Sequence, residues 1–324
     1  MASTRLYRDG VLVAEDFPVS EVSEHLRDSA ATIWVDLCAP TEEDVADIRD
    51  ELGLHRLAIE DAVLEDHQRP KLDHYDTHLF LVAYAVRMPA KTGTLATTEL
   101  AAFITERALV TVRKNDQFDM APVVRRWDAA SGLAKAGVPF LLHGLLDHVV
   151  DGHFDAAQAL DDRIEALEEA VFDDHVDRHT TQRGLLRLRR SLLKLRHVVL
   201  PMREVVNSLM VREHDLVNDE MMPYYQDVYD HVLRATEWTE TLRELISSIR
   251  ETQLSVQSNR LNTIMKKVTS WAAIIAVPTA VTGFYGQNLP YPGFEQTWGV
   301  WTSTALIVIL SVALYRTFKR HDWL

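Results

Sequence analysis

Cysteine is almost absent from this sequence of 324 residues. Cys38 is the only one, so no intrachain disulfide can form and a metal site made of several thiolates is excluded. The glycine-rich phosphate-binding patterns and the His-Glu-x-x-His zinc pattern are missing as well. These absences remove the usual signs of nucleotide-dependent and zinc-protease chemistry, and we expect no enzyme.

Charge is absent from two long stretches near the C-terminus. Val268–Tyr285 and Trp298–Tyr315 are each 18 residues long and contain no charged side chain. An apolar run of about 18 residues is long enough to cross a bilayer as a helix. The segment between them, 286–297, contains two prolines and two glycines, and a helix cannot continue through it. The sequence therefore predicts a membrane hairpin.

Basic residues flank this hairpin but are missing from its loop. Lys266 and Lys267 precede the first span, whereas Arg316, Lys319 and Arg320 follow the second. Basic flanks stay on the cytoplasmic side of a membrane. The first residues of the chain also lack the apolar core of a signal peptide. We expect a multi-pass protein of the inner (plasma) membrane with both termini in the cytoplasm.

The net charge of −14 is unevenly distributed. From Ser258 onward there are six basic and two acidic residues, which gives +4. The preceding 257 residues carry 28 basic and 46 acidic side chains, which gives −18. An acidic body attracts cations. We therefore expect divalent cations and the lipid membrane as partners, and no nucleic acid.

Residues 5–134 alternate short strand-like and helix-like segments, which predicts an α/β or α+β domain. Helices are expected after the cap residue Thr41 and over His55–Leu64, and a hairpin loop over Pro89–Thr98. The expected strands are Leu6–Val13, Thr32–Leu37, His78–Arg87, Leu100–Thr105 and Ala108–Arg113.

Two helices of opposite charge are expected next. Leu141–Phe172 has a dense acidic face, and Thr181–Leu200 is basic. Such neighbours predict an antiparallel hairpin with complementary charges, and a paired, solvated face explains the acids better than a dedicated metal site. His143, His148 and His153 recur every five residues, which does not place them on one helix face.

A long helix is predicted to lead into the first span. Pro201 and Pro223 interrupt the preceding stretch, but no proline or glycine occurs over the 54 residues from Tyr224 to Val277. Apolar residues recur there every seven positions, as in Val228, Ala235 and Leu242, which is typical of a seam that packs on other helices. One protomer can hardly bury so long a helix, so we expect self-association around an axis.

Several segments together resemble the CorA family of magnesium channels. Tyr285-Gly286-Gln287-Asn288 is similar to the family's Tyr-Gly-Met-Asn signature. His67–Leu72 resembles its N-domain motif, Tyr224–His231 the start of its stalk, and Lys319–Leu324 its basic tail ending in Trp-Leu. These segments occur in the family's order and cover nearly the whole chain.

The resemblance implies an α+β fold with an N-terminal α/β/α cytoplasmic domain, a long stalk helix and two C-terminal transmembrane helices. It also implies a homopentamer in which five first spans surround one pore. The implied parts are a cytoplasmic α/β domain (1–135), a helical hairpin (136–222), the stalk (223–267), a pore-lining span (268–285), an extracytoplasmic loop (286–297), a second span (298–316) and a basic tail (317–324).

Site residues follow from the same resemblance. Asn288 is implied to contact the incoming hydrated ion, with Tyr285, Gly286 and Gln287 shaping the outer mouth and Glu295 attracting ions. Met265, Val268 and Ala276 match a hydrophobic gate. Asn262 and Thr279 match further pore-facing positions. The spacing of Asn262, Met265, Val268, Ala276 and Thr279 places them near one helix face, which supports the assignment independently.

The chemistry of these residues suits Mg²⁺. This ion prefers oxygen ligands and gives up water reluctantly, so a ring of neutral amides can hold its hydration shell. A channel also needs weak, multiple sites. Gln287 replaces the family's methionine, and relatives with variants at this position move zinc, which leaves Zn²⁺ or Co²⁺ as the alternative cargo. Against zinc, no His or Cys occurs from Asn259 to Arg320.

In the family, intracellular Mg²⁺ binds between subunits and holds the pore closed. The resemblance implies that Asp227 is one ligand of this Mg²⁺. The partner ligand would come from Arg87–Ala90, which contains no carboxylate, so Asp230 or Glu99 is a possible substitute. The leading hypothesis is thus a Mg²⁺ channel gated by cytosolic Mg²⁺. The alternatives are a Zn²⁺ or Co²⁺ transporter of the same fold and a membrane-anchored cytosolic sensor without transport.

Overall fold

The computed structural model describes residues 2–63, 68–89, 93–130, 132–172, 178–214, 216–287, 290 and 293–324, with the backbone alone for Phe172 and Arg178. The chain forms two compact units, Met1–Ser247 and Ser248–Leu324. Each unit is described by itself below.

Strands and short helices dominate the first 136 residues. The strands are β1 (Ala2–Arg8), β2 (Val11–Glu15), β3 (Ala31–Cys38), β4 (Lys71–His74), β5 (Leu79–Arg87), β6 (Ala96–Ile104) and β7 (Ala108–Arg113). The helices among them are η1 (Val19–Glu21), α1 (Val22–His25), α2 (Glu42–Leu52), α3 (Arg56–Val63), α4 (Ala121–Ala129) and η2 (Ala134–Ala136). Four long helices follow: α5 (Val138–Phe172), α6 (Arg178–Arg212), α7 (Met222–Tyr285) and α8 (Thr297–Arg320).

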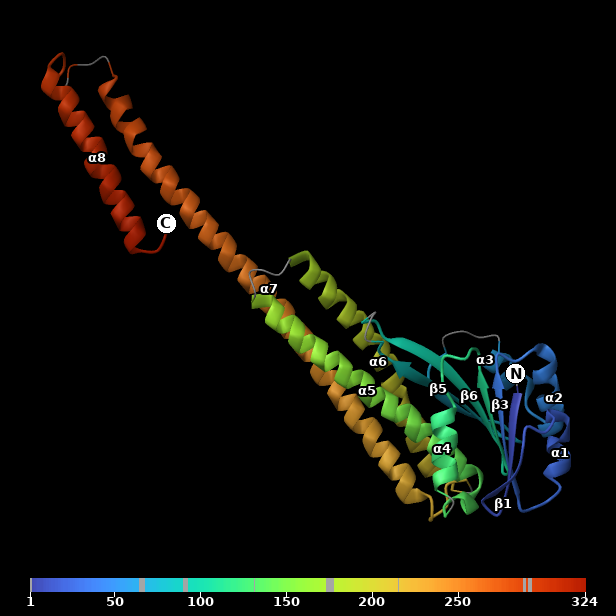
Figure 1. Cartoon of the computed structure of the whole chain (residues 1–324). Helices are drawn as coiled ribbons and strands as arrows, with labels where there is room; N and C mark the ends of the chain where they lie inside the picture. The colour runs from blue at the N-terminus through green and yellow to red at the C-terminus, as the bar shows by residue number, and fades with distance from the viewer. Residues whose placement is uncertain are drawn as a thin grey trace. The chain divides into compact units, whose positions relative to one another are not determined.

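The strands form one mixed sheet in the order β2-β1-β3-β7-β6-β5-β4. Among the described strands, only β3 and β7 run parallel, with Val35 opposite Val110, and the other neighbours are antiparallel. Figure 1 shows α1, α2 and α3 on one side of this sheet and α4 and α5 on the other. The predicted α/β/α domain is therefore confirmed.

The prediction of one strand over Leu6–Val13 is wrong, because the chain turns in its middle. Arg8 pairs with Val11, which leaves Asp9 and Gly10 as a two-residue loop between β1 and β2. Both have positive φ angles, 52° and 78°. Asp-Gly is a favoured sequence for a hairpin turn of this kind, because glycine tolerates positive φ at no steric cost.

The other predicted elements lie close to their observed positions. Thr41 caps α2, and the Asp44 side chain reaches back to the Thr41 amide in a capping box. The strand expected from Leu100 begins at Ala96, so β6 takes in part of the expected loop. The end of the predicted helix His55–Leu64 and residues 90–92 of that loop lie outside the described residues.

The acidic and basic segments form α5 and α6, as the charge pattern predicts. Pro201 does not interrupt the second of them, since α6 continues to Arg212. Met202, Val205 and Leu209 beyond the proline are buried in the core cluster. Burial of this face offsets the backbone hydrogen bond that a proline inside a helix loses.

The sequence predicts ion pairs between α5 and α6, but the described ion pairs join these helices to other elements. Arg126 of α4 pairs with two aspartates of α5, and Arg196 of α6 pairs with Glu240 of α7. The two helices pack against each other, and each has buried apolar residues, such as Leu160 and Ile164 of α5 and Leu188 of α6.

The first half of α7 packs inside one chain. Its residues from Tyr225 to Leu242 at the predicted seam are buried, and Tyr225 donates a hydrogen bond of 2.9 Å to the Pro139 carbonyl. Its neighbours in the core come from α5 and α6, including Leu142, Val149, Met202 and Val206. A three-helix arrangement therefore satisfies this part of the seam without a second copy.

The second unit contains the C-terminal part of α7 and all of α8. Both helices are long and apolar enough to cross a membrane, and few residues of their apolar windows are buried. Figure 1 shows α8 returning antiparallel to the end of α7. Because α8 extends to Arg320, four residues that were expected in the tail, 317–320, are helical.

Candidate functional site

One face of α7 in the second unit carries the residues expected to line a pore. Met265 and Val268 are 66% and 63% exposed, although both are large and apolar. Asn262, Ala276 and Thr279 are exposed as well.

A different face of the same helix is covered. Ser270 is fully buried and Val281 is 9% exposed, and α8 is the other helix of this unit. At about 100° per residue, these two positions lie roughly opposite the expected pore residues. The structure therefore leaves the expected pore face free of intrachain packing.

Pro278 lies within this segment without ending the helix. Its ring nitrogen has no hydrogen to donate, so the carbonyl of Ile274 loses its usual helical partner. The hydroxyl of Thr279 donates a hydrogen bond of 3.3 Å to the Ile275 carbonyl, and that of Thr282 donates one of 2.8 Å to the Pro278 carbonyl. A hydroxyl that donates its hydrogen keeps both lone pairs, so the two threonine oxygens remain available as acceptors here.

The turn after α7 begins with the signature residues. Tyr285 is the last helical residue, and the Gly286 amide donates to the Thr282 carbonyl at 2.8 Å. Gly286 and Gln287 are exposed. Asn288, to which the sequence assigns the ion contact, lies outside the described residues.

The end of the loop is held by a close approach of two glycines. Gly293 has φ +91°, and a Cβ atom added to it would lie 3.0 Å from the Gly299 Cα atom. Glu295, between them, is exposed and has φ 59°, an uncommon angle for a residue with a side chain. Its carboxylate is thus available to solvent beside the turn.

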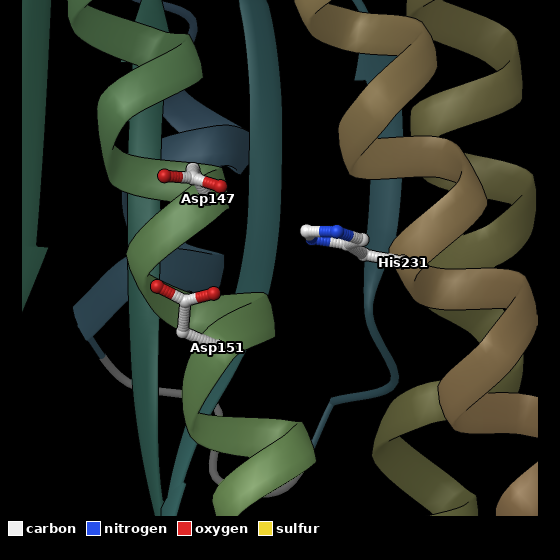
Figure 2. Close-up of side chains that lie close together, drawn as sticks. All are labelled: Asp147, Asp151 and His231. Carbon is white, nitrogen blue, oxygen red and sulfur yellow. The ribbon is translucent and has the colours of Figure 1, made fainter.

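A second group of candidate ligands lies in the first unit. Asp147 and Asp151 are one turn apart on α5, and His231 of α7 faces them (Figure 2). One ligand atom from each of the three lies within 4.8 Å of the others, and all three side chains are partly exposed. Carboxylate and imidazole ligands suit several divalent ions.

This group already has an internal cation. The two terminal nitrogens of Arg126 contact one aspartate each, Asp147 and Asp151. The Nδ1 atom of His231 is buried without a hydrogen-bond partner, and its Nε2 lies 3.9 Å from Asp227. Nearby, burial lowers the pKa of His143 and favours its neutral form, although Asp147 and Asp227 oppose this.

Sequence reasoning did not find this grouping. The spacing of four between Asp147 and Asp151 was a usable signal, but the approach of His231 depends on how α7 packs on α5. The three evenly spaced histidines are buried or partly buried. His153 in particular is fully buried and contacts the Tyr84 carbonyl at 2.8 Å.

The residues predicted to bind regulatory Mg²⁺ differ in exposure and in their contacts. Asp227 and Asp230 are exposed on α7. Arg87 is exposed at the end of β5, and Ala90 lies outside the described residues. Glu99 is engaged within the sheet domain, since it accepts a hydrogen bond of 2.6 Å from Tyr84 and pairs with Lys114 at 3.1 Å. Glu99 is therefore a poor substitute ligand.

Comparisons with known proteins agree with this architecture. The family described as CorA-like Mg2+ transporter protein matches residues 29–320. The cobalt/magnesium transport protein CorA of Thermotoga maritima is 31% identical over 316 residues, which cover 95% of this chain and 89% of that protein. The complete structure of the CorA magnesium transporter from Methanocaldococcus jannaschii superimposes with a TM-score of 0.80 at 22% identity, over 100% of this chain and 99% of that one. The full-length CmaX structure gives a TM-score of 0.71 at 21% identity, over 99% and 97% of the two chains.

A mixed-sheet domain and a long helix that leads into two apolar C-terminal segments are the architecture of the full-length CorA structure. The chain belongs to the CorA-like Mg2+ transporter family and is a divalent-cation transporter of that family. The resemblance inferred from the four sequence segments is thereby confirmed.

Proposed function

We propose that this protein forms a homopentameric channel for Mg²⁺ uptake that cytosolic Mg²⁺ closes. The observation that carries the proposal is the face of α7 with Asn262, Met265, Val268, Ala276 and Thr279, which is exposed in the single chain and uncharged throughout. This face joins apolar residues to the polar side chains of Asn262 and Thr279, for which lipid offers no hydrogen-bond partner, and copies of the same helix around an axis would remove them from lipid.

Within such a ring, polar residues would contact the ion and apolar residues would form the gate. Asn288 would hold the hydrated ion at the outer mouth through neutral amide oxygens, which weaken binding enough for release. Thr279 and Asn262 would supply oxygens deeper in the path. Met265, Val268 and Ala276 would form a narrow apolar stretch that excludes water when closed.

Regulation is assigned to the first unit. Asp227 and Asp230 are exposed carboxylates on α7, where a neighbouring protomer could approach them. Mg²⁺ bound at Asp227 would hold protomers together and keep the path closed. Glu295 would raise the local cation concentration at the outer mouth.

The orientation follows from the basic flanks of the two spans. Lys266, Lys267, Arg316, Lys319 and Arg320 flank the spans, which supports cytoplasmic positions for both termini and insertion in the inner (plasma) membrane. In that orientation the negative interior of the cell drives cations inward.

Co²⁺ or Zn²⁺ is the second candidate cargo. The relative from Thermotoga maritima is named a cobalt/magnesium transport protein, and the cytoplasmic domain of a ZntB protein has a similar fold with a TM-score of 0.57. Gln287 adds an amide at the mouth. The lack of His and Cys from Asn259 to Arg320 favours Mg²⁺ over Zn²⁺.

The test is flux into liposomes that contain the purified full-length protein and a Mg²⁺-sensitive dye. Wild type should conduct Mg²⁺, and Asn288→Ala should reduce the rate about tenfold or more, as expected when an ion loses an amide contact worth about 1.4 kcal/mol. Asn207→Ala, at an exposed position of α6, is the matched control and should conduct like wild type.

Equal flux for wild type and Asn288→Ala would remove Asn288 from the path. Flux of Zn²⁺ or Co²⁺ without Mg²⁺ would select the second candidate, and no flux of any of the three would leave the sensor hypothesis.

A further inference from the structure

We propose that a pocket between Lys266 of α7 and Trp323 of the C-terminal tail binds the phosphate of an anionic phospholipid in the cytoplasmic leaflet. The pocket lies within the second unit and has a volume of about 520 Å³. Its walls are Asn259, Asn262, Thr263, Met265, Lys266, Thr269 and Trp323.

The tail forms one wall because it folds back at the end of α8. Asp322 has φ 56°, which reverses the chain, and the Trp323 amide donates to the Phe318 carbonyl at 2.9 Å. The Trp323 and Phe318 rings stack with centroids 5.6 Å apart and planes 10° apart. The indole is thus fixed by a backbone hydrogen bond and a ring contact.

The facing wall offers hydrogen-bond donors and one positive charge. Asn259, Thr263 and Lys266 recur at spacings of four and three, so they form one stripe of α7. Within the described part of the chain, no carboxylate forms an ion pair with Lys266. An ammonium, an amide and a hydroxyl with no opposing acid are the chemistry that recognises a phosphate.

The position of the pocket in the chain selects a lipid phosphate over a free one. Lys266 lies two residues before the first apolar span, and Trp323 lies eight residues after the second, in the tail that folds back. Tryptophan and basic side chains gather at the headgroup level of membranes, and the cytoplasmic leaflet carries the anionic lipids.

The donor stripe Asn259, Thr263 and Lys266 lies on a different face of α7 from Val268 and Thr279. Asn262 and Met265 lie at the edge between the pocket and the proposed conduction path, whereas Lys266 and Trp323 line the pocket alone. The inference rests on the membrane orientation given under the proposed function, and it does not require that any particular ion be conducted.

The test is binding of phosphatidylglycerol to the full-length protein in phosphatidylcholine nanodiscs, followed by native mass spectrometry. At raised ionic strength the diffuse attraction of basic residues is screened, while a direct contact is affected less. Lys266→Gln should weaken binding about fivefold, which corresponds to about 1 kcal/mol for one basic residue near the surface. Trp323→Ala should weaken it in the same direction.

Lys267→Gln is the matched control, because it removes the same charge at the neighbouring position outside the pocket. It should bind like wild type. Equal weakening by the two lysine variants, or none by Lys266→Gln, would overturn the proposal. Displacement of the lipid by inorganic phosphate would also overturn it, by assigning the pocket to a free anion. Because the assay does not measure flux, its result is independent of which ion the channel conducts.

Discussion

Gly299, the third residue of α8, faces the backbone of Gly293 at the end of the loop between the two apolar helices. A Cβ atom on Gly299 would collide with the Gly293 carbonyl oxygen. The Gln296 amide donates to that same carbonyl at 3.1 Å, so a small turn is fixed where the second span begins. The loop that carries the signature residues is therefore anchored at this end by contact between two glycines.

Gly299→Ala should lower the midpoint of thermal unfolding in detergent. Inserting one methyl group against a backbone oxygen costs about 1–3 kcal/mol of overpacking. Gly283→Ala is the control, since nothing lies within 4 Å of a Cβ atom added there. It should be neutral or slightly stabilising, because alanine is the better helix former. Equal destabilisation by both variants would show that the close approach has no special weight.

Arg126→Gln should make the first unit sensitive to divalent cations. Without the guanidinium, Asp147 and Asp151 repel each other, and we expect a loss of about 1 kcal/mol, kept small because both pairs are partly exposed to solvent. Millimolar Mg²⁺ should restore more stability to this variant than it gives the wild type.

The control for this effect is Arg126→Gln combined with Asp147→Asn and Asp151→Asn. Removing both carboxylates should remove the extra Mg²⁺ response. A response that persists in the triple variant would place the cation elsewhere. Thermal unfolding with and without Mg²⁺ measures both outcomes.

His153 should make the folded state sensitive to acid. Complete burial lowers its pKa from 6.5 to about 4, while the contact with the Tyr84 carbonyl opposes the shift. The unfolded chain therefore binds the proton between pH 6.5 and about 4, whereas the folded chain does not. Stability should fall as pH falls through this window, by up to about 3 kcal/mol.

His153→Gln keeps an N–H donor for Tyr84 but cannot take up the proton. Its unfolding free energy should depend less on pH between 6.5 and 4 than that of wild type. His197→Gln, at an exposed position of α6, should keep the wild-type slope. An unchanged slope in His153→Gln would mean that other groups cause the acid loss.

Val268→Ser should increase resting flux if Val268 belongs to an apolar gate. A hydroxyl favours water in the constriction and so weakens closure by dewetting. Val300→Ser is the matched control, because Val300 of α8 is 67% exposed against 63% for Val268 and carries the same substitution. The measurement is liposome flux of the two variants at high internal Mg²⁺. Equal flux in Val268→Ser and Val300→Ser would show that Val268 is not part of the gate.

Asp227→Asn should weaken the closing effect of internal Mg²⁺ and leave the maximal flux unchanged. One carboxylate ligand contributes about 1–3 kcal/mol through its charge, so closure should need about tenfold more Mg²⁺. Glu244→Gln, another exposed acid of α7, should leave the response as in wild type. If both variants respond like wild type, the sensor does not include Asp227.

Local chemistry explains which features could be predicted. The two spans follow from 18 uncharged residues each, and the capping box at α2 from Thr41 followed by Asp44. The strand error at Leu6–Val13 arose because apolar residues on both sides of Asp9-Gly10 concealed a two-residue turn. Pro201 was misread because burial on one helix face, which the sequence does not reveal, outweighs a lost backbone hydrogen bond.

The sequence by itself determined the membrane hairpin, its orientation signals, the family and the helix face that carries Met265 and Val268, because each depends on residues close together in the chain. Only the tertiary structure decided which surfaces remain free. It buried the first half of the α7 seam against α5 and α6, joined Arg126 to two aspartates opposite His231, and set Trp323 beside Lys266. These arrangements depend on packing between segments that are far apart in the chain, and local sequence patterns do not predict that packing.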